Sequence, residues 1–290
     1  MSKPQVIILG AGKPFSGERP SALVEAPWAK RRVLDWLLEA FAILGEAEFH
    51  FVGGYRLEDV VARYPNIYFS VNPEWKISGV AGSLLSAPLD EGRAAYVCYA
   101  DNVFSPEVVL SLNTNAADIV LCIDRQWRVR YEGRSIEDLA RAEKVLMHPD
   151  GRIELGQDIE LGVADGELVG VFRFSARAIT VVKELGHEMI GSDFGRSDMP
   201  SFISLLVSHG LTIGIVENTG RWAELNAPQD LARFVLGTKA ETLERLRPLV
   251  QISRIGEQIC FTNDEWRRDG IAVISAIQQK FASASLVVRS

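Results

Sequence analysis

Two closely spaced glycines follow a short apolar run near the start of the chain, and basic residues follow the glycines. The run Val6–Leu9 predicts a buried strand, and Gly10–Gly12 comes directly after it. Because glycine has no Cβ and tolerates positive φ, such a turn brings backbone N–H groups close to an anion. Lys13 and Arg19 add positive charge to the same loop. We therefore predict an anion-binding loop, with a tight turn that holds no ligand as the alternative.

Apolar runs alternate with helical patterns in the first 125 residues. Strands that are apolar throughout indicate a parallel sheet covered by helices on both faces. In such sheets ligands bind beyond the carboxyl ends of the strands. The opening loop and Asp101 both follow apolar runs, and a glycine turn around Gly82 lies between them in the chain. The expected strands are Phe49–Val52, Ile67–Val71, Ala95–Tyr99 and Ile119–Ile123, and helices are expected at Val33–Leu44, Leu57–Tyr64 and after Gly79.

After Gln126 apolar and polar residues alternate in several short stretches. We therefore expect an α/β fold whose mostly parallel mixed sheet has antiparallel strands added at its edge. The added strands are expected at Trp127–Tyr131, Lys144–Met147, Arg152–Leu155 and Leu168–Phe174. Helices are then predicted at Ser201–Ser208, capped by Asp198, and at Gln229–Leu236, and strands at Thr212–Val216 and Arg221–Leu225.

Gly237 marks the expected boundary between a domain at 1–236 and an extension at 237–290. In the extension we expect helices at Lys239–Arg247 and Glu265–Phe281, and strands at Val250–Ile252 and Ser285–Ser290.

Composition narrows the class of protein. The 290 residues carry a formal net charge of −7, which argues against bulk binding of nucleic acid. The three cysteines are far apart in the sequence, as in proteins of a reducing compartment. Neither a signal-peptide pattern nor a long apolar run occurs, so we expect a cytoplasmic protein without membrane contact.

Five segments, in this order, resemble the nucleotidyltransferases that activate sugar phosphates, phosphocholine or aminoethylphosphonate with CTP or another NTP. The first is the opening strand with Gly10–Gly12, which is similar to the family's nucleotide-binding signature. The others are Gly79–Leu84, Tyr99–Val103 (similar to a Gly-Asp-Asn motif), Glu167–Gly170 (Gly-Glu-Phe-Ile-Gly) and Trp222–Leu231 (Trp-x-Glu-Ile-Asp-Thr-Pro-Glu-Asp-Leu). The resemblance covers roughly residues 5 to 236 and implies a glycosyltransferase-A-like, Rossmann-like fold.

The family's reaction is attack by a phosphate or phosphonate oxygen on the α-phosphorus of the NTP, with release of pyrophosphate. Positioning and neutralisation of charge dominate such catalysis, and Mg²⁺ is held by one or two carboxylates together with phosphate oxygens. The resemblance implies nucleotide contacts at Leu9, Gly10, Ala11, Gly12, Gly82 and Ser83, acceptor contacts at Lys144, Glu167 and Gly170, Mg²⁺ ligands at Asp101 and Asn226, and catalytic roles for Lys13, Arg19 and Asp101.

The sequence departs from the family at the residue that neutralises the transferred phosphate. The family has a lysine where this chain has Ser21. A hydroxyl cannot replace that charge, so Lys13 and Arg19 are the candidates to supply it. The alternative is that both are solvated loop charges, in a nucleotide-binding module with impaired catalysis.

Other proposed ligands also have simpler alternatives. Asn226 stands where the family usually has Asp, and it is equally suited to cap the helix that begins near Pro228. Asp101 could cap a helix near Pro106, and Lys144 could be a solvated residue at a strand edge. A glycosyltransferase on the same fold is a further alternative, although no Asp-x-Asp motif occurs at Asp101.

The last five residues are similar to a run in phosphoenolpyruvate synthases and pyruvate phosphate dikinases. Leu286–Ser290 resembles the Val-Arg-Ser-Ser segment of their nucleotide-binding domain. The resemblance implies a fused or partner kinase-like domain that begins after residue 237, and an edge strand docked on the main domain is the alternative.

Overall fold

The computed structural model describes residues 3–14, 17–26, 30–131, 134–189, 193–218, 220–226, 228–237, 239–248, 250–252, 254–261, 263–281 and 286. The chain divides into two compact units, Met1–Val235 and Leu236–Ser290. This division falls one residue before the boundary expected at Gly237, and the assignment of separate domains stays a prediction.

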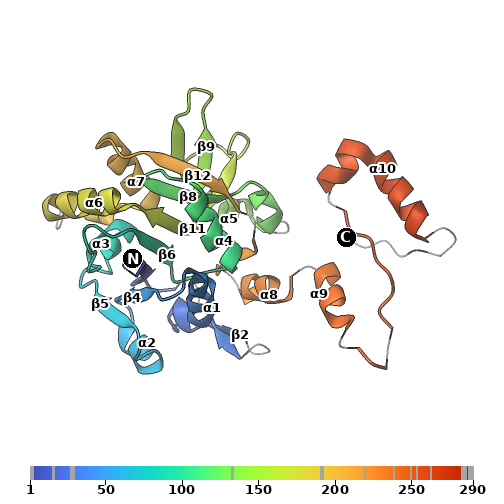
Figure 1. The fold of residues 1–290 in the computed structure, drawn as a ribbon, viewed down its shortest axis with the longest axis horizontal. Coiled ribbons are helices and arrows are strands. Elements are labelled where there is room, and N and C mark those ends of the chain that lie inside the picture. Colours follow the sequence, from blue (N-terminus) through green and yellow to red (C-terminus); the bar gives the residue numbers. More distant parts are fainter. Residues whose placement is uncertain are drawn as a thin grey trace. The chain divides into compact units, whose positions relative to one another are not determined.

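A mixed sheet forms the centre of the first unit (Figure 1). Its spatial order is β10-β9-β11-β6-β1-β4-β5, and β8 joins it by pairing with both β11 and β12. The strands β1, β4, β5 and β6 run parallel to one another, and β12 runs parallel to β8. Among the described residues the sheet has nine strands: β1 (Gln5–Gly10), β4 (Glu48–Gly53), β5 (Tyr68–Val71), β6 (Ala95–Tyr99), β8 (Ile119–Asp124), β9 (Lys144–Met147), β10 (Ile153–Gly156), β11 (Gly166–Phe174) and β12 (Ile213–Glu217).

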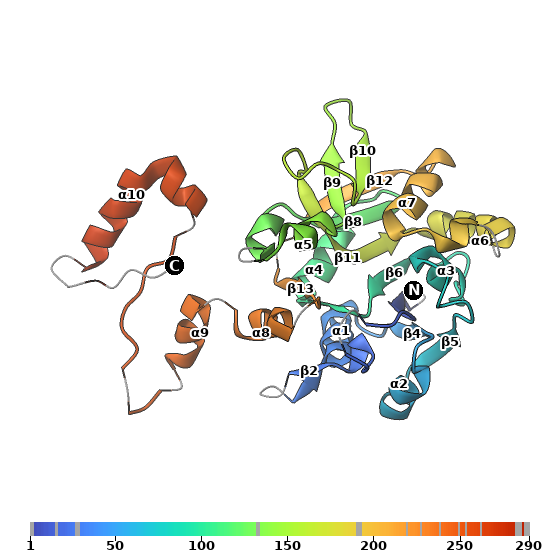
Figure 2. The same cartoon turned by 180° about the vertical axis from the view of Figure 1, so that it is seen from behind.

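Helices cover both faces of this sheet, as two separate buried clusters show (Figure 2). One cluster lies beneath α1 (Val33–Phe41), α2 (Leu57–Arg63), α4 (Pro106–Ser111) and α8 (Pro228–Leu236). The other lies beneath α3 (Val80–Leu85), α6 (Ala176–Met189) and α7 (Met199–Ser208). The predicted α/β class is therefore confirmed. The remaining elements of the unit are η1 (Ser21–Leu23), β2 (Glu25–Ala26), β3 (Arg31–Arg32), η2 (Ala42–Leu44), β7 (Asn102–Phe104), η3 (Leu112–Thr114), η4 (Trp127–Tyr131), α5 (Ile136–Ala140), η5 (Asp193–Arg196) and β13 (Trp222–Glu224).

Two sequence-based expectations about the antiparallel segments are wrong. The strand β11 lies inside the sheet, between β6 and β8, whereas the β9–β10 hairpin is the antiparallel addition. The segment Trp127–Tyr131 is a 3-10 helix rather than a strand. In a strand its three apolar residues at alternate positions would share one face, but Trp127 and Tyr131 are buried and Val129 is 46% exposed.

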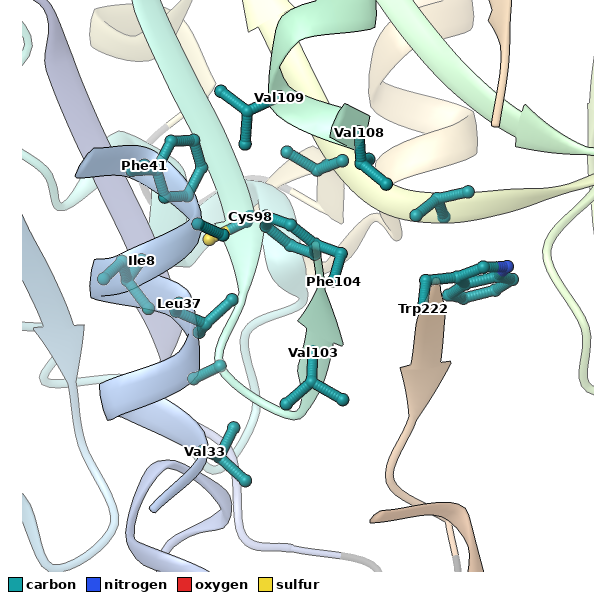
Figure 3. Packing of buried hydrophobic residues seen from close by; sticks show 14 of the residues in the cluster. Ile8, Val33, Leu37, Phe41, Cys98, Val103, Phe104, Val108, Val109 and Trp222 are labelled. Atoms are coloured by element: carbon teal, nitrogen blue, oxygen red, sulfur yellow. The ribbon is translucent and has the colours of Figure 1, made fainter. Parts of the chain in front are cut away.

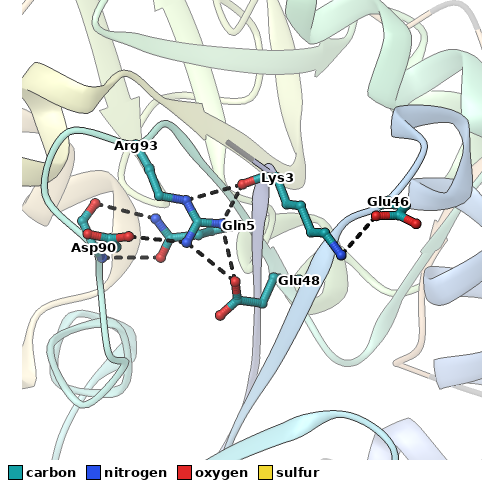
Figure 4. Close-up of polar contacts among 6 residues, drawn as sticks. All are labelled: Lys3, Gln5, Glu46, Glu48, Asp90 and Arg93. Atoms are coloured by element: carbon teal, nitrogen blue, oxygen red, sulfur yellow. Dashed lines mark hydrogen bonds and ion pairs between the residues drawn. The ribbon is translucent and has the colours of Figure 1, made fainter. Parts of the chain in front are cut away.

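The amino ends of the strands are closed by a polar network (Figure 4). Gln5 exchanges two hydrogen bonds with the backbone of Asp90, at 3.3 and 3.1 Å. Arg93 donates to the carbonyl of Lys3 and pairs with Glu48 at 3.3 Å. These contacts join the starts of β1 and β4 to the segment before β6.

The second unit contains α9 (Lys239–Leu246) and α10 (Asn263–Phe281), the latter kinked at Asp269. The strand expected at Val250–Ile252 is absent, and Ile252 is fully exposed. Within the described ranges no residue of this unit belongs to the buried core. The strand expected at Ser285–Ser290 lies outside the described residues, apart from Leu286. Every described helix in the chain is too short or too polar to cross a membrane.

The buried face of α1 packs against the short strand β7 (Figure 3). Leu37 and Phe41 lie one helical turn apart on α1 and are fully buried. Phe41 meets Phe104 of β7 edge to face, with ring centroids 5.6 Å apart. Because β7 follows Asp101 directly, this packing also fixes the residue predicted to hold a metal.

The substitution Phe104→Ala should lower the free energy of unfolding by about 3–5 kcal/mol, because it removes a buried ring and leaves a cavity. Ile136→Ala, at a residue that is 75% exposed, is the control and should change it by less than about 0.5 kcal/mol. Urea denaturation measures both values, and equal effects of the two substitutions would contradict the assigned core.

Candidate functional site

The opening glycines differ in what surrounds them. A Cβ on Gly10 would lie 2.3 Å from the Phe51 ring and 2.8 Å from the Cβ of Ala100, so close packing requires a glycine there. No heavy atom would lie within 4 Å of a Cβ on Gly12. The carbonyl of Ala11 accepts a hydrogen bond from the N–H of Tyr55 at 2.9 Å. Gly10 is therefore needed by the fold itself, whereas Gly12 leaves its surroundings open to a ligand.

The predicted cations of the opening loop are exposed. Lys13 lies 5.9 Å above the ring of Tyr55, and Arg19 is exposed to solvent. Tyr55 and Arg56 both donate hydrogen bonds to the carbonyl of Glu18, at 3.1 and 3.2 Å, and so tie this loop to the end of β4. Ser21 begins η1, whose next two residues are buried. The loop thus has a fixed base, and its positive charges are accessible to solvent.

Asp101 lies where two short antiparallel strands meet. The strands β7 and β13 pair so that Glu224 is opposite Asn102, and the N–H of Leu225 donates to the carbonyl of Asp101 at 2.9 Å. This pairing brings Asp101 to the segment that ends in Asn226. Burial, and next the negative charge of Glu224, raise the pKa of Asp101 to about 7. Ser105 occupies the N-cap position of α4, so Asp101 does not have the alternative capping role.

Glu143 is a third carboxylate of this region that sequence reasoning did not select. Its oxygens accept hydrogen bonds from the Tyr99 hydroxyl at 3.2 and 3.0 Å. Burial, followed by the charge of Glu224, raises the pKa of Glu143 to about 8. Glu224 was also missed, although it lies in the Trp-x-Glu part of the motif. Only the pairing of strands more than 100 residues apart reveals that these carboxylates interact.

Gly170 positions the chain next to Asp101. It has φ of +72° in a β-bulge of β11, and a Cβ there would lie 2.1 Å from the side-chain nitrogen of Asn102. That nitrogen donates to the carbonyl of Val169 at 2.6 Å. In this structure Gly170 therefore allows Asn102 to reach β11, and its predicted contact with an acceptor stays a prediction.

The other two residues predicted to bind the acceptor are engaged by protein groups. Lys144 is 1% exposed, and its ammonium donates to the carbonyls of Ala140 and Ala142 at 3.0 and 3.1 Å. Burial lowers the pKa of Lys144. Glu167 is equally buried and pairs with Arg130 at 2.6 Å. Burial raises the pKa of Glu167 to about 7, while the charge of Arg130 lowers it.

The glycine turn before α3 is closed by another segment of the chain. The N–H of Gly79 donates to the carbonyl of Gly195 at 2.9 Å, and a Cβ on Gly82 would lie 2.7 Å from that carbonyl oxygen. Ser83 is buried and accepts a hydrogen bond from Asn72 at 3.0 Å. The glycines thus accommodate a close backbone approach, and nucleotide contacts at Gly82 and Ser83 stay predictions. The nearby Asp198 caps α7, as expected, at 2.9 Å from the N–H of Ser201.

The oxygen donors around Asp101 fit a hard cation such as Mg²⁺. Asp101 and Glu224 supply carboxylates, Asn226 supplies an amide, and Mg²⁺ needs only one or two protein carboxylates when phosphates complete its coordination. Burial and the charge of Glu224 raise the pKa of Asp101, so a cation bound beside it would stabilise its charged form. Within the described ranges no group of three or more His, Cys, Asp or Glu side chains is arranged to hold a metal ion. Two carboxylates and an amide are donors of the kind that Mg²⁺ takes together with phosphate oxygens.

No protein-family model matches the sequence, and a search of curated proteins finds no significant match. Solved structures are similar. The inositol-1-phosphate CTP transferase of T. maritima has 19% sequence identity and a TM-score of 0.60, over 82% of this chain and 94% of that chain. A Bacillus anthracis protein described as a glucose-1-phosphate thymidylyltransferase has 15% identity and a TM-score of 0.58, over 87% and 97%. HddC from Yersinia pseudotuberculosis has 13% identity and a TM-score of 0.57, over 80% and 97%. The chain therefore has the α/β fold of these proteins.

Proposed function

We propose that the protein is a Mg²⁺-dependent nucleotidyltransferase. It joins an NTP, with CTP favoured, to a phosphorylated or phosphonate small molecule and releases pyrophosphate. The observation that carries this proposal is the meeting of Asp101 with Glu224 at the carboxyl edge of the sheet. The likeness of the fold to nucleotidyltransferases supports it, and the name of the T. maritima enzyme supports the choice of CTP.

The proposed metal site follows from the charges of these residues. Asp101 and Asn226 hold Mg²⁺, and the carboxylate of Glu224 adds negative charge beside them. When bound, Mg²⁺ neutralises phosphate charge that would otherwise oppose the reaction. A single neutral amide in place of the family's second carboxylate leaves more of the coordination to phosphate oxygens.

The opening loop is the proposed phosphate contact. Backbone N–H groups near Gly12 approach the triphosphate, where nothing fills the space beside that glycine. Lys13 and Arg19 supply the charge that Ser21 lacks, because both are exposed on this loop. The acceptor's phosphate is brought in line with the α-phosphorus by groups of the β9 and β11 ends, near Lys144, Glu167 and Gly170.

A nucleotide-binding module with impaired catalysis is the second candidate, in line with a kinase-like partner or fused domain. Ser21 and the engagement of the Lys144 ammonium by two carbonyls favour it. Such a module would gain thermal stability from an NTP with Mg²⁺ but release no pyrophosphate with any acceptor.

The substitution Asp101→Asn should lower kcat for pyrophosphate release about 10²-fold or more, because it removes the charged ligand of the metal. It should also abolish the Mg²⁺-dependent rise in melting temperature that CTP produces. Asp150→Asn, in the exposed β9–β10 turn, is the matched control and should leave both unchanged. Undiminished turnover in Asp101→Asn would refute the assigned metal site.

Neutralising Lys13 or Arg19 tests whether these cations take part in catalysis or are only solvated charges of the loop. We expect Lys13→Met or Arg19→Met to lower kcat about tenfold or more, because each removes a charge that neutralises the phosphates. Lys183→Met, which removes the α6 partner of an ion pair with Glu91, is the control. Initial rates at saturating CTP and Mg²⁺ measure the effect. If both variants turn over like the control, the loop charges play no part in catalysis.

Stability without Mg²⁺ should depend on pH through Glu143. Its pKa is raised from 4.5 to about 8 in the folded chain, so the folded state holds a proton that the unfolded state has lost. Stability therefore falls as pH rises between these values. Glu143→Gln keeps an acceptor for Tyr99 and should raise the melting temperature at pH 8.5 but not at pH 4. Glu160→Gln, at an exposed position, is the control. If Glu143→Gln changed the melting temperature equally at both pH values, the raised pKa assigned to Glu143 would be contradicted.

A further inference from the structure

Arg130 and Arg134 contact residues that lie before and after the proposed metal ligand Asn226 in the chain. Arg130 lies over the ring of Trp222, four residues before Asn226, with its Cζ 3.6 Å from the ring centroid. Arg134 forms an ion pair with Asp230, four residues after Asn226. Both arginines are mostly buried, and Asp230 is 4% exposed. The segment from Trp222 to Asp230 is therefore held on both sides of Asn226.

The first contact is anchored in the central sheet. The guanidinium of Arg130 pairs with Glu167 of β11 at 2.6 Å, and Glu167 also accepts from the Tyr131 hydroxyl at 2.5 Å. The indole N–H of Trp222 donates to Asp124, at the end of β8, at 2.8 Å. One guanidinium thus makes an ion pair and a stacking contact together, which the planar arginine head permits and lysine does not.

The second contact is anchored through α8. The N–H of Asn226 donates to the Oδ2 of Asp230 at 3.0 Å, so the acid that pairs with Arg134 also fixes the backbone of Asn226. Arg233, one turn further along α8, donates to the carbonyl of Val129 at 3.2 Å. These bonds fasten the start of α8 to the arginine-bearing segment.

We propose that Arg130 and Arg134 are positioning residues that hold Glu224 and Asn226 at the cation site, an inference that rests on the proposed function. A neutral amide binds Mg²⁺ less strongly than a carboxylate does. The amide of Asn226 therefore contributes more to Mg²⁺ binding when the protein already holds it in place, because no conformational entropy is then lost on binding. Functional groups must be held within about 0.5 Å of their productive positions by such supporting contacts. The buried carboxylate of Glu167 then serves to orient Arg130, which explains why it is enclosed by protein.

The test compares Arg130→Lys, which keeps the charge beside Glu167, with Arg130→Met, which removes it. Arg177→Met, which breaks an ion pair with Asp118 at the other end of β8, is the control for a general loss of stability. Three quantities are measured on the full chain. The first is amide hydrogen exchange of peptides covering 222–230 without ligands, and the second is the Mg²⁺ concentration that half-saturates the thermal shift with CTP. The third is kcat for pyrophosphate release at saturating Mg²⁺.

In Arg130→Lys we expect about tenfold faster amide exchange in 222–230 and about a tenfold higher half-saturating Mg²⁺ concentration, because the residues that hold Mg²⁺ lose a supporting contact. The kcat at saturating Mg²⁺ should be almost unchanged. Arg130→Met should show larger shifts of the same kind, and Arg177→Met neither. Unchanged exchange in Arg130→Lys would overturn the proposal, as would an equal increase in Arg177→Met. If the unmodified protein shows no response to Mg²⁺ with any NTP, the proposed function fails, and the exchange data alone then decide whether the arginines order the segment.

Discussion

The candidate site depends on the antiparallel pairing of β7 and β13. Each strand has three residues, and they come from parts of the chain more than 100 residues apart. So short a pair is marginal in water by itself. Here Phe104 packs beneath α1 and Trp222 is 8% exposed, so the hydrophobic core holds both strands. The position of Asp101 relative to Glu224 is thus decided by apolar packing rather than by their own charges.

That packing brings like charges together at an energetic cost. Asp101 and Glu143 both have raised pKa values, and the charge of Glu224 contributes to each shift. Carboxylates that were important only for the fold would be more stable apart or paired with a cation. Arginines are present nearby, but Arg130 is directed to Glu167 and Arg134 to Asp230. These two arginines therefore pair with carboxylates outside the central group, and neither pair supplies a counter-ion to Asp101, Glu143 or Glu224.

The sequence predicted the parallel strands well, because strands buried on both faces carry unbroken apolar runs. The boundaries of β6 match the expectation, and those of β1 and β8 extend it by one residue at one or both ends. The strand β11 is buried at nearly every position, as an interior strand is, but its sequence also contains Glu167 and Arg173, and its neighbours suggested an edge. Glu143 and Glu224 could not be found in this way, since no periodic pattern relates residues that meet only through the pairing of distant strands.

The glycines of the predicted motifs differ in how tightly the surrounding protein constrains them. At Gly10, Gly82 and Gly170 a Cβ would collide with neighbouring protein atoms, so the fold alone requires glycine there. At Gly12 a Cβ would meet nothing, and the fold gives no reason for glycine. The positive charges of Lys13 and Arg19 are exposed on the same loop. The phosphate contact proposed above would therefore lie at the outer half of the loop, where a ligand could approach the backbone closely, rather than at its buried base.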